Sequence, residues 1–162
     1  MSQTALIPLT QGKYAIVDAE DFEWLSKHKW HCNNSYATRQ DRSSRNRVNV
    51  KMARLLMGCS CGDGNEVDHI NHNTLDNRRC NLRICTTQQN QHNRKSYVGG
   101  SSPFKGVSFS KDGKRKRRWR AGIEIDGSKK RLGYYATELE AAEAYNEAAK
   151  KYFGEFAYLN EI

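Results

Sequence analysis

Four side chains between residues 68 and 90 have types that together could hydrolyse a phosphodiester bond: Asp68, His69, Asn81 and Asn90. A neutral imidazole is a suitable base near pH 7, so His69 could take a proton from an attacking water. Asp68 and Asn90 offer oxygen ligands to a divalent cation, which would stabilise charge on the phosphate and on the leaving oxygen. Asn81 could bond to His69 or to the loop that follows it, and so fix the ring.

These side chains need a hairpin and a helix to meet. The segment 67–70 is typical of a strand end, the segment 81–85 of a return strand, and Thr86 or Thr87 can cap a helix that begins at Gln88. Asp68 and His69 then end one strand, Asn81 begins the next, and Asn90 lies one turn into the helix. The order predicts a ββα unit in which the hairpin and the helix bring the four together.

The stretch resembles the catalytic motif of HNH-type homing endonucleases from bacteriophages, in the variant that ends in Asn. The resemblance covers residues 6–95 and includes the segments 76–78 and 81–83. It implies that Asp68 is a metal ligand, His69 the general base, Asn81 its support and Asn90 a second metal ligand. It also implies double-stranded DNA as substrate, Mg²⁺ as the metal with Mn²⁺ as the alternative, and the cytosol of a phage-infected bacterium as the location.

One position departs from that family. A His-Arg pair commonly precedes the motif in a short helix, and here Ala53 stands where the histidine would be, followed by Arg54. If that histidine binds metal or phosphate, activity is attenuated, and the sequence does not decide whether Ala53 is natural. Four further residues are candidate phosphate contacts, with a loop or solvated role as the alternative: His72, Arg83, Asn93 and Arg94.

The cysteines raise a second possibility, a structural zinc site. Cys59 and Cys61 precede the motif, and Cys80 and Cys85 flank its return strand. Two CxxC pairs would favour zinc, but this spacing does not, so structural Zn²⁺ is not expected and reduced, buried thiols are. A zinc-stabilised binding module without catalysis remains an alternative.

The first half also predicts elements around the motif. A strand is expected over 14–17, a helical turn from Asp18, the two strands of a hairpin over 30–38 and 47–52, and a short helix over 52–57 that ends at Gly58. The polar tip 39–46 of that hairpin contains three arginines.

The second half predicts a three-stranded meander and one helix. Strands are expected over 105–110, 119–125 and 130–135, with Asp-Gly turns at 112–113 and 126–127. Thr137 and Glu140 form a capping box for a helix that runs to Lys151, with Gly154 after it. Alternation along 119–125 places the apolar residues on one face, where they can pack on Leu139, Ala142 and Tyr145, and the polar residues on the other.

Residues 103–160 resemble the ethylene-response-factor type of DNA-binding domain, which lays a three-stranded sheet in the major groove. The matching residues include Lys105-Gly-Val, Trp119-Arg-Ala-Gly-Ile and Arg131-Leu-Gly-Tyr-Tyr. Several arginines of the plant pattern are absent, so the target sequence does not transfer. The resemblance and the alternation imply that the residues facing DNA are Lys105, Ser108, Ser110, Arg118, Arg120, Gly122, Glu124, Lys129 and Arg131.

Charge supports a nucleic-acid partner. The 162 residues have a formal net charge of +9, and residues 105–131 alone hold 11 Lys or Arg against three Asp or Glu. Within them, the run 114–118 is most simply a phosphate clamp. No apolar run approaches the length of about 20 residues that a membrane span needs, and no signal peptide is recognisable, so we expect no membrane partner and a cytosolic protein.

Together the patterns predict an α+β protein in two parts. An HNH ββα-metal nuclease domain with additional N-terminal strands occupies 1–95, a linker 96–103, and a DNA-binding domain with a three-stranded antiparallel sheet on one helix 104–162. The expected function is a metal-dependent DNA endonuclease that nicks as a monomer or breaks both strands as a homodimer; the sequence leaves the oligomeric state and the target open. The rival is a DNA-binding regulator with a silent HNH module.

Overall fold

The computed structural model describes residues 3–41, 48–60, 62–95, 99–111, 116 and 118–162. The described residues form a mixed α/β structure with small sheets and four α-helices. The chain divides into an N-terminal unit, Met1–Asn90, and a C-terminal unit, Gln91–Ile162. The predicted linker 96–103 lies within the second unit, and its residues 96–98 are outside the description. Among the described residues no helix is long and apolar enough to cross a membrane.

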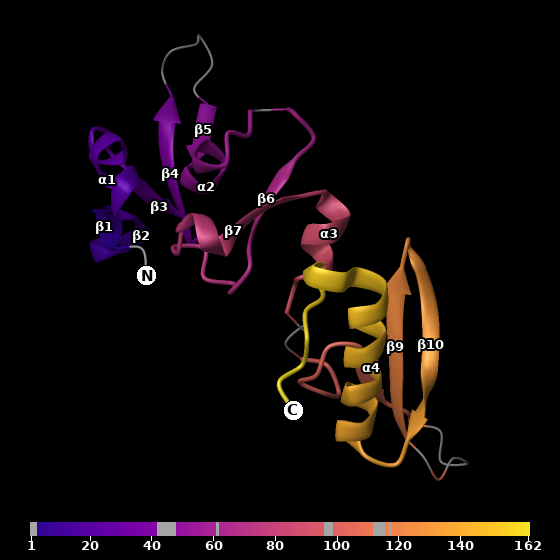
Figure 1. The fold of residues 1–162 in the computed structure, drawn as a ribbon. Coiled ribbons are helices and arrows are strands. Elements are labelled where there is room, and N and C mark those ends of the chain that lie inside the picture. Colours follow the sequence, from indigo (N-terminus) through magenta and orange to yellow (C-terminus); the bar gives the residue numbers. More distant parts are fainter. Residues whose placement is uncertain (1–2, 42–47, 61, 96–98, 112–115, 117) are drawn as a thin grey trace. The chain divides into compact units, whose positions relative to one another are not determined.

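The N-terminal unit is built from three small antiparallel sheets and short helices (Figure 1). β1 pairs with β2, β3 and β5 flank β4, and β6 pairs with β7. The elements in chain order are β1 (Thr4–Pro8), the 3-10 turn Thr10–Gly12, β2 (Tyr14–Asp18), α1 (Ala19–Ser26), β3 (His31–Asn33), β4 (Tyr36–Asp41), β5 (Val48–Lys51), α2 (Met52–Leu56), β6 (Glu66–His69), the 3-10 turn Arg79–Asn81, β7 (Leu82–Cys85) and α3 (Thr87–His92).

The core of this unit gathers apolar residues from all the first elements. Ile7, Val17, Leu25 and Met52 are each at most 1% exposed, and Trp30 is buried with its indole N–H on the Leu25 carbonyl, 2.9 Å away. β1 was not expected from the sequence, because its segment is short and its outward residues are mixed in polarity. The single strand expected over 30–38 was wrong: the chain turns at Asn34 and Ser35, both with positive φ, and the segment forms β3 and β4 as a hairpin. The remaining strands and helices were predicted within a few residues of their bounds.

The β6–β7 hairpin and α3 follow one another as the sequence predicts. Asn81 lies in the turn just before β7, so the return strand begins one residue later than expected. Thr86 caps α3: its hydroxyl accepts from the Gln89 N–H at 3.2 Å, while the Gln89 side chain accepts from the Thr86 N–H at 2.8 Å. This reciprocal cap fixes where α3 starts and hence where Asn90 lies.

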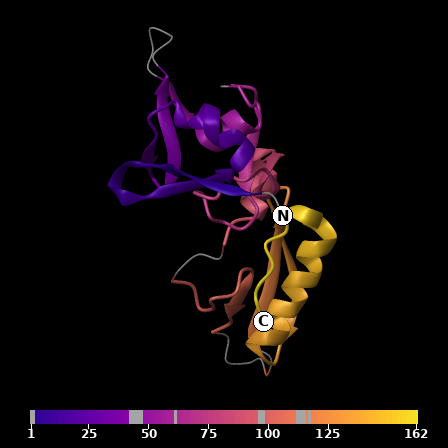
Figure 2. The ribbon, with the colours of Figure 1, turned by 60° about the vertical axis from the view of Figure 1, so that its left-hand side comes forward.

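The C-terminal unit is a three-stranded antiparallel sheet with one long helix along it (Figure 2). β9 is central, between β8 and β10, and the elements are β8 (Val107–Phe109), β9 (Trp119–Ile125), β10 (Ser128–Tyr135), α4 (Glu138–Phe153) and the 3-10 turn Gly154–Phe156. The capping box of Thr137 and Glu140 is confirmed, as is the end of α4 at Gly154. The predicted turn 112–113 lies outside the described residues.

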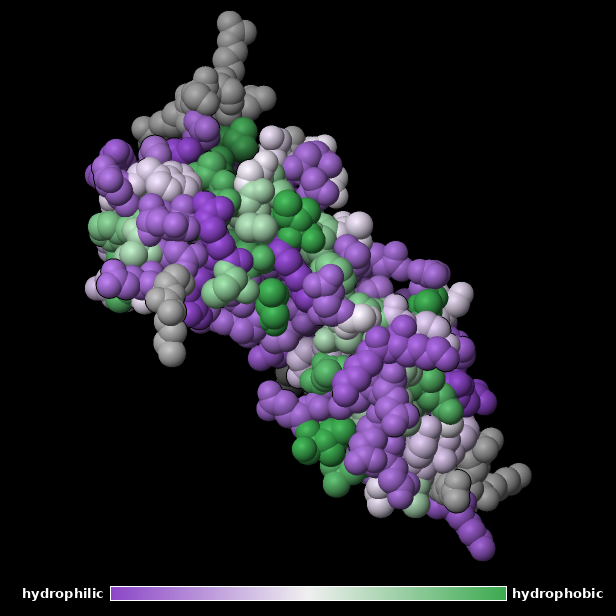
Figure 3. Space-filling view, in the orientation of Figure 1, coloured by the Kyte–Doolittle hydropathy of each residue, from purple (hydrophilic) through white to green (hydrophobic). Residues whose placement is uncertain are grey.

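The alternation along β9 is confirmed. Ala121 and Ile123 are at most 4% exposed and pack in two clusters with Ala142 and Tyr145 of α4, whereas Arg120 and Glu124 are exposed. Leu139 was wrongly assigned to this interface: it is 51% exposed, because one residue past the helix start it points away from the sheet. The outward side of α4 is mainly hydrophilic (Figure 3).

Candidate active site

One face of the β6–β7 hairpin carries the two acidic side chains of the site. Cross-strand partners share a face, and Glu66 pairs with Cys85 while Asp68 pairs with Arg83. Asp68 is 6% exposed. Arg83 donates to its Oδ2 from Nε at 2.9 Å and from Nη2 at 2.7 Å. The carboxylate that the sequence assigns to metal therefore already has a cationic partner.

Asn90 reaches the same face from α3. Its Nδ2 donates a hydrogen bond to Glu66 Oε2, and the hydroxyl of Thr87 donates to Glu66 Oε1 at 3.0 Å. Glu66 thereby ties α3 to the face of the hairpin that carries Asp68. Because the amide nitrogen of Asn90 donates to Glu66, the amide oxygen is the atom that Asn90 could offer to a cation.

His69 lies on the opposite face of β6, because successive strand residues point to opposite sides. It is 5% exposed. Its Nε2 lies 3.3 Å from Asn77 Oδ1, and its ring centroid is 6.1 Å from that of Tyr36. Burial is the main reason that the pKa of His69 is below its usual value of 6.5, and it outweighs the opposing effects of Asn77, Asp68 and Asp76. The imidazole is therefore neutral at pH 7.

Lys51 brings a positive charge to this side of the hairpin. Its Nζ lies 4.4 Å from the Tyr36 ring centroid, and it contributes to lowering the pKa of His69. A cation beside a neutral imidazole opposes protonation of the ring and attracts an anion to the same place.

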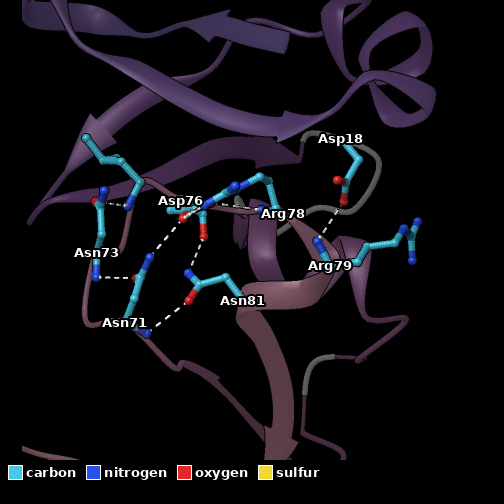
Figure 4. Close-up of polar contacts among 8 residues, drawn as sticks. Asp18, Asn71, Asn73, Asp76, Arg78, Arg79 and Asn81 are labelled. Carbon is cyan, nitrogen blue, oxygen red and sulfur yellow. Dashed lines mark hydrogen bonds and ion pairs between the residues drawn. The ribbon is translucent and has the colours of Figure 1, made fainter. Parts of the chain in front are cut away.

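Asn81 supports the loop after His69 and not the ring itself. Its Oδ1 accepts from the Asn71 N–H at 2.9 Å, and its Nδ2 donates to the Asp76 carbonyl at 2.7 Å. Figure 4 shows these bonds spanning the loop from Asn71 to the turn before β7. Of the two roles that the sequence left open for Asn81, the geometry is that of the loop support.

Two arginines brace the same loop. Arg78 donates to Asp76 at 2.7 Å and 2.6 Å, and the backbone N–H of Arg79 donates to Asp18 at 2.8 Å (Figure 4). The Arg79 guanidinium also holds Asp21 at 2.9 Å and 2.8 Å, and this contact helps to lower the pKa of Asp21 against the opposing effect of its burial. The loop is thus anchored to the beginning of the chain.

Comparisons with known proteins show the family of this chain. A family model described as HNH endonuclease matches residues 58–92, the segment that contains β6, β7 and α3. An uncharacterized HNH endonuclease of Acanthamoeba polyphaga mimivirus is 32% identical over 153 residues, which is 94% of this chain and 77% of that protein. The chain belongs to the HNH endonuclease family. No solved structure matches it significantly.

Ala53 and the cysteines lie around this site. Ala53 is 5% exposed and packs in the core of the N-terminal unit, so a histidine there would need space among Met52 and Leu56. Burial raises the pKa of the Cys85 thiol to about 11, which disfavours the thiolate that zinc needs. Cys59 is half-buried and Cys80 exposed, and Cys61 lies outside the described residues. Among the described residues no group of three or more His, Cys, Asp or Glu could hold a metal.

In the C-terminal unit, one face of the sheet gathers most of the residues that the sequence assigned to DNA. Across β8, β9 and β10, Ser108 pairs with Arg120, Arg131 with Gly122 and Lys129 with Glu124, so all six share the face opposite α4. Arg120 Nε donates to Ser108 Oγ at 3.1 Å. Beyond the strand ends, the Ser110 N–H donates to the Arg118 carbonyl at 2.7 Å, and Arg118 lies over the Phe109 ring at 4.6 Å. Of the run 114–118, only residues 116 and 118 are described.

Other candidates are placed differently. Lys105 Nζ donates to the carbonyls of His92 and Arg94 at 2.6 Å and 2.7 Å, so its charge serves the fold of the C-terminal unit. Asn93 is buried, at 5% exposed. His72 is half-buried in a loop with φ of 62°, and Arg94 is exposed.

The position of Lys105 predicts a pH dependence. Burial lowers its pKa to about 8 from the usual 10.5, with a smaller effect of Arg94. Between these two values the unfolded chain binds more protons than the folded chain, so stability should rise with pH from 8 towards 10. Urea unfolding followed by circular dichroism should show the midpoint increasing over this range. The variant Lys105→Met should lose the increase; parallel curves for both proteins would contradict it.

Two residues of the site were missed by sequence reasoning. Glu66 was passed over because a lone glutamate at a strand start has no distinctive spacing, although it lies two positions before Asp68, on the same face. Asn77 was noted only as part of a matching segment. Its contact with His69 depends on how the loop folds back, and no periodicity reveals that.

Proposed function

We propose that this protein is a metal-dependent DNA endonuclease of the homing type, which hydrolyses one phosphodiester bond per active site in duplex DNA. The observation that carries the proposal is the placement of Asp68 and Asn90 on one face of the hairpin, with the neutral imidazole of His69 buried on the other face of the same strand. Together with α3, this would make a ββα-metal site. Membership of the HNH endonuclease family supports nuclease activity.

In this proposal His69 takes the proton of the attacking water. A base must be neutral and held in a fixed direction, and the low pKa of His69 and its contact with Asn77 satisfy both needs. Lys51 would attract the phosphate, because its ammonium lies over the Tyr36 ring beside His69. Asn81 would hold the loop that follows His69 and so help to fix the position of the ring.

The donor chemistry fits a divalent cation. Asp68 and Asn90 are hard oxygen ligands, and Mg²⁺ is commonly held by one or two side chains with water and phosphate oxygens completing its shell. We propose Mg²⁺, with Mn²⁺ as the alternative; when bound, the ion would stabilise charge on the phosphate. Arg83 would have to share Asp68 with the ion or release it. A structural zinc is not part of the proposal.

The C-terminal unit would hold the DNA, in the manner of an ethylene-response-factor type domain. The face of the sheet opposite α4 carries the side chains of Arg120, Lys129 and Arg131 on neighbouring strands. The same face includes Ser108, Gly122 and Glu124. The proposed interface does not include Lys105, whose ammonium is bonded to backbone carbonyls. We place the protein in the cytosol of a phage-infected host, nicking as a monomer or breaking both strands as a homodimer.

A salt titration tests the DNA-binding face. The double variant Arg120→Gln, Arg131→Gln should weaken DNA binding at least tenfold and reduce the magnitude of the log–log salt slope by about 0.9 for each phosphate that is no longer neutralised. Lys27→Gln is the matched control, because Lys27 is a surface residue of the N-terminal unit paired with Glu23 at 3.7 Å. Fluorescence anisotropy on one duplex at several salt concentrations gives both quantities. Equal slopes for all three proteins would exclude this face.

A second candidate, a DNA-binding regulator with a silent nuclease module, has one specific argument. Asp68 is already paired with Arg83, and Ala53 replaces the histidine common in the family. Plasmid nicking with Mg²⁺, with and without chelator, separates the two functions for the natural chain, Ala53→His and His69→Ala. Chelator-sensitive nicking by the natural chain that is lost in His69→Ala supports the endonuclease. Nicking by all three proteins removes His69 as base, and nicking by none favours the regulator.

A further inference from the structure

The backbone of Asn77 is held in place by hydrogen bonds to β2, and its side chain is buried. Asn77 is 1% exposed. Its N–H donates to the Ile16 carbonyl at 2.7 Å, and the Ile16 N–H donates to the Leu75 carbonyl at 2.8 Å. These two bonds form a parallel bridge between β2 and the loop, so the backbone of Asn77 is set by a strand from the start of the chain.

The residues on both sides of Asn77 add to this. Asp76 before it is held by Arg78 and accepts from Asn71 Nδ2 at 2.8 Å. Two residues after it, the N–H of Arg79 donates to Asp18 (Figure 4), and its guanidinium holds Asp21. The loop is therefore braced at three successive points, and the Cα of Asn77 has little freedom.

From this fixed position, the side chain of Asn77 contacts His69. Its Oδ1 lies 3.3 Å from His69 Nε2, while its Nδ2 has no hydrogen-bond partner among the described residues. A buried amide N–H without a partner costs free energy, so an apolar residue would suit this position better if packing were its only purpose. The hydrogen bond to His69 is the interaction that explains an asparagine at this position.

That bond decides which nitrogen of His69 is basic. A carbonyl oxygen can only accept, so a hydrogen bond to Asn77 Oδ1 places the proton of the neutral ring on Nε2. The lone pair is then on Nδ1. We infer that Asn77 is a positioning residue that holds His69 in the Nε2–H tautomer and presents Nδ1 as the base. This inference rests on the proposed function only for the use of Nδ1, because the tautomer itself is a property of the folded chain.

Nitrogen NMR tests the tautomer without DNA or metal. In the full chain labelled with ¹⁵N-histidine at pH 8, the His69 signals are those absent from the His69→Gln spectrum. We expect a protonated-type shift for Nε2 and an unprotonated-type shift for Nδ1. Asn77→Asp, which keeps an acceptor, should preserve this pattern, and Asn77→Ala should move both shifts towards an average of the two tautomers. Asn73→Ala is the control, since exposed Asn73 accepts from the Leu75 N–H in the same loop.

Kinetics tests the use of that tautomer. Asn77→Ala should slow single-turnover nicking about 10- to 100-fold at saturating DNA and metal, with unchanged DNA affinity, as expected for a misdirected base. A natural-chain spectrum with the proton on Nδ1 overturns the inference, even if Asn77→Ala does not fold. So does an Asn77→Ala protein with the spectrum and rate of the natural chain. Nicking that persists in His69→Ala instead defeats the proposed role of His69 and leaves the tautomer result standing.

Discussion

Replacing His69 with alanine should reduce Mg²⁺-dependent nicking about 100- to 10,000-fold, the range that general-base catalysis contributes. His69 directly follows Asp68 in the sequence. DNA binding should be unaffected by the substitution, because His69 is only 5% exposed. His31→Ala is the matched control, since His31 is an exposed histidine on β3 of the same unit. Single-turnover nicking of a supercoiled plasmid gives the rates, and circular dichroism shows that both variants fold.

The same experiment across pH adds a second readout. A base acts in its deprotonated form, so the rate falls as the pH drops through the pKa of His69. Because burial lowers this pKa below 6.5, the midpoint of the decline should lie below pH 6.5. The residual rate of His69→Ala should lack this decline. A rate lost already above pH 7, or one equal in His69→Ala and His31→Ala, would contradict the assignment.

Gly106→Ala should destabilise the C-terminal unit by about 2–5 kcal/mol, from the left-handed backbone and from overpacking combined. Gly106 has φ of +75°, and a Cβ there would lie 2.0 Å from Tyr145 Cδ2 and 2.6 Å from the Gly122 carbonyl oxygen. Tyr145 is buried and packs on Ile123 of β9, so neither the ring nor the strand can give way easily. The free energy of unfolding in urea measures the effect, and DNA affinity should fall with it.

Gly127 supplies a control with the same backbone strain. Its φ is +74°, yet a Cβ there would meet nothing within 4 Å. Gly127→Ala should therefore cost only about 1–2 kcal/mol, the part due to the left-handed conformation. Equal losses in the two variants would mean that the approach of Gly106 to Tyr145 contributes nothing to stability.

Sequence reasoning predicted the strands and helices better than the contacts between them. The alternation of Trp119 to Ile125 set the two faces of β9, and Thr137 with Glu140 set the start of α4, because both patterns are local. Leu139 was misplaced, because it is one residue from a helix start. The bonds of Lys105 to the carbonyls of His92 and Arg94 were not foreseen either. Their directions depend on tertiary packing that neighbouring residues do not encode.

The candidate site shows the same division. Residue types, spacing and the family resemblance together singled out Asp68, His69, Asn81 and Asn90 as a hairpin-and-helix set. The chain folds in that order, with His69 on the opposite face of β6 from Asp68. The residues that orient the set could not be found in this way. Glu66 holds Asn90 across two elements, and Asn77 reaches His69 only because its loop is bound to Ile16. Such contacts join residues far apart in the chain, and no periodic pattern in a single sequence predicts them.

The brace between the loop and β2 has a consequence for how the protein folds. The bond from Arg79 to Asp18 joins residues 61 positions apart, so chain entropy opposes this closure more than that of the β6–β7 hairpin itself. We expect the hairpin to form early and the surroundings of His69 to become rigid only when the first strands dock. During synthesis β1 and β2 are made first, but they can pack on the loop only after the hairpin has been made. A fragment limited to residues 58–92 would contain the proposed base and both proposed metal ligands and still lack the part of the chain that orders them.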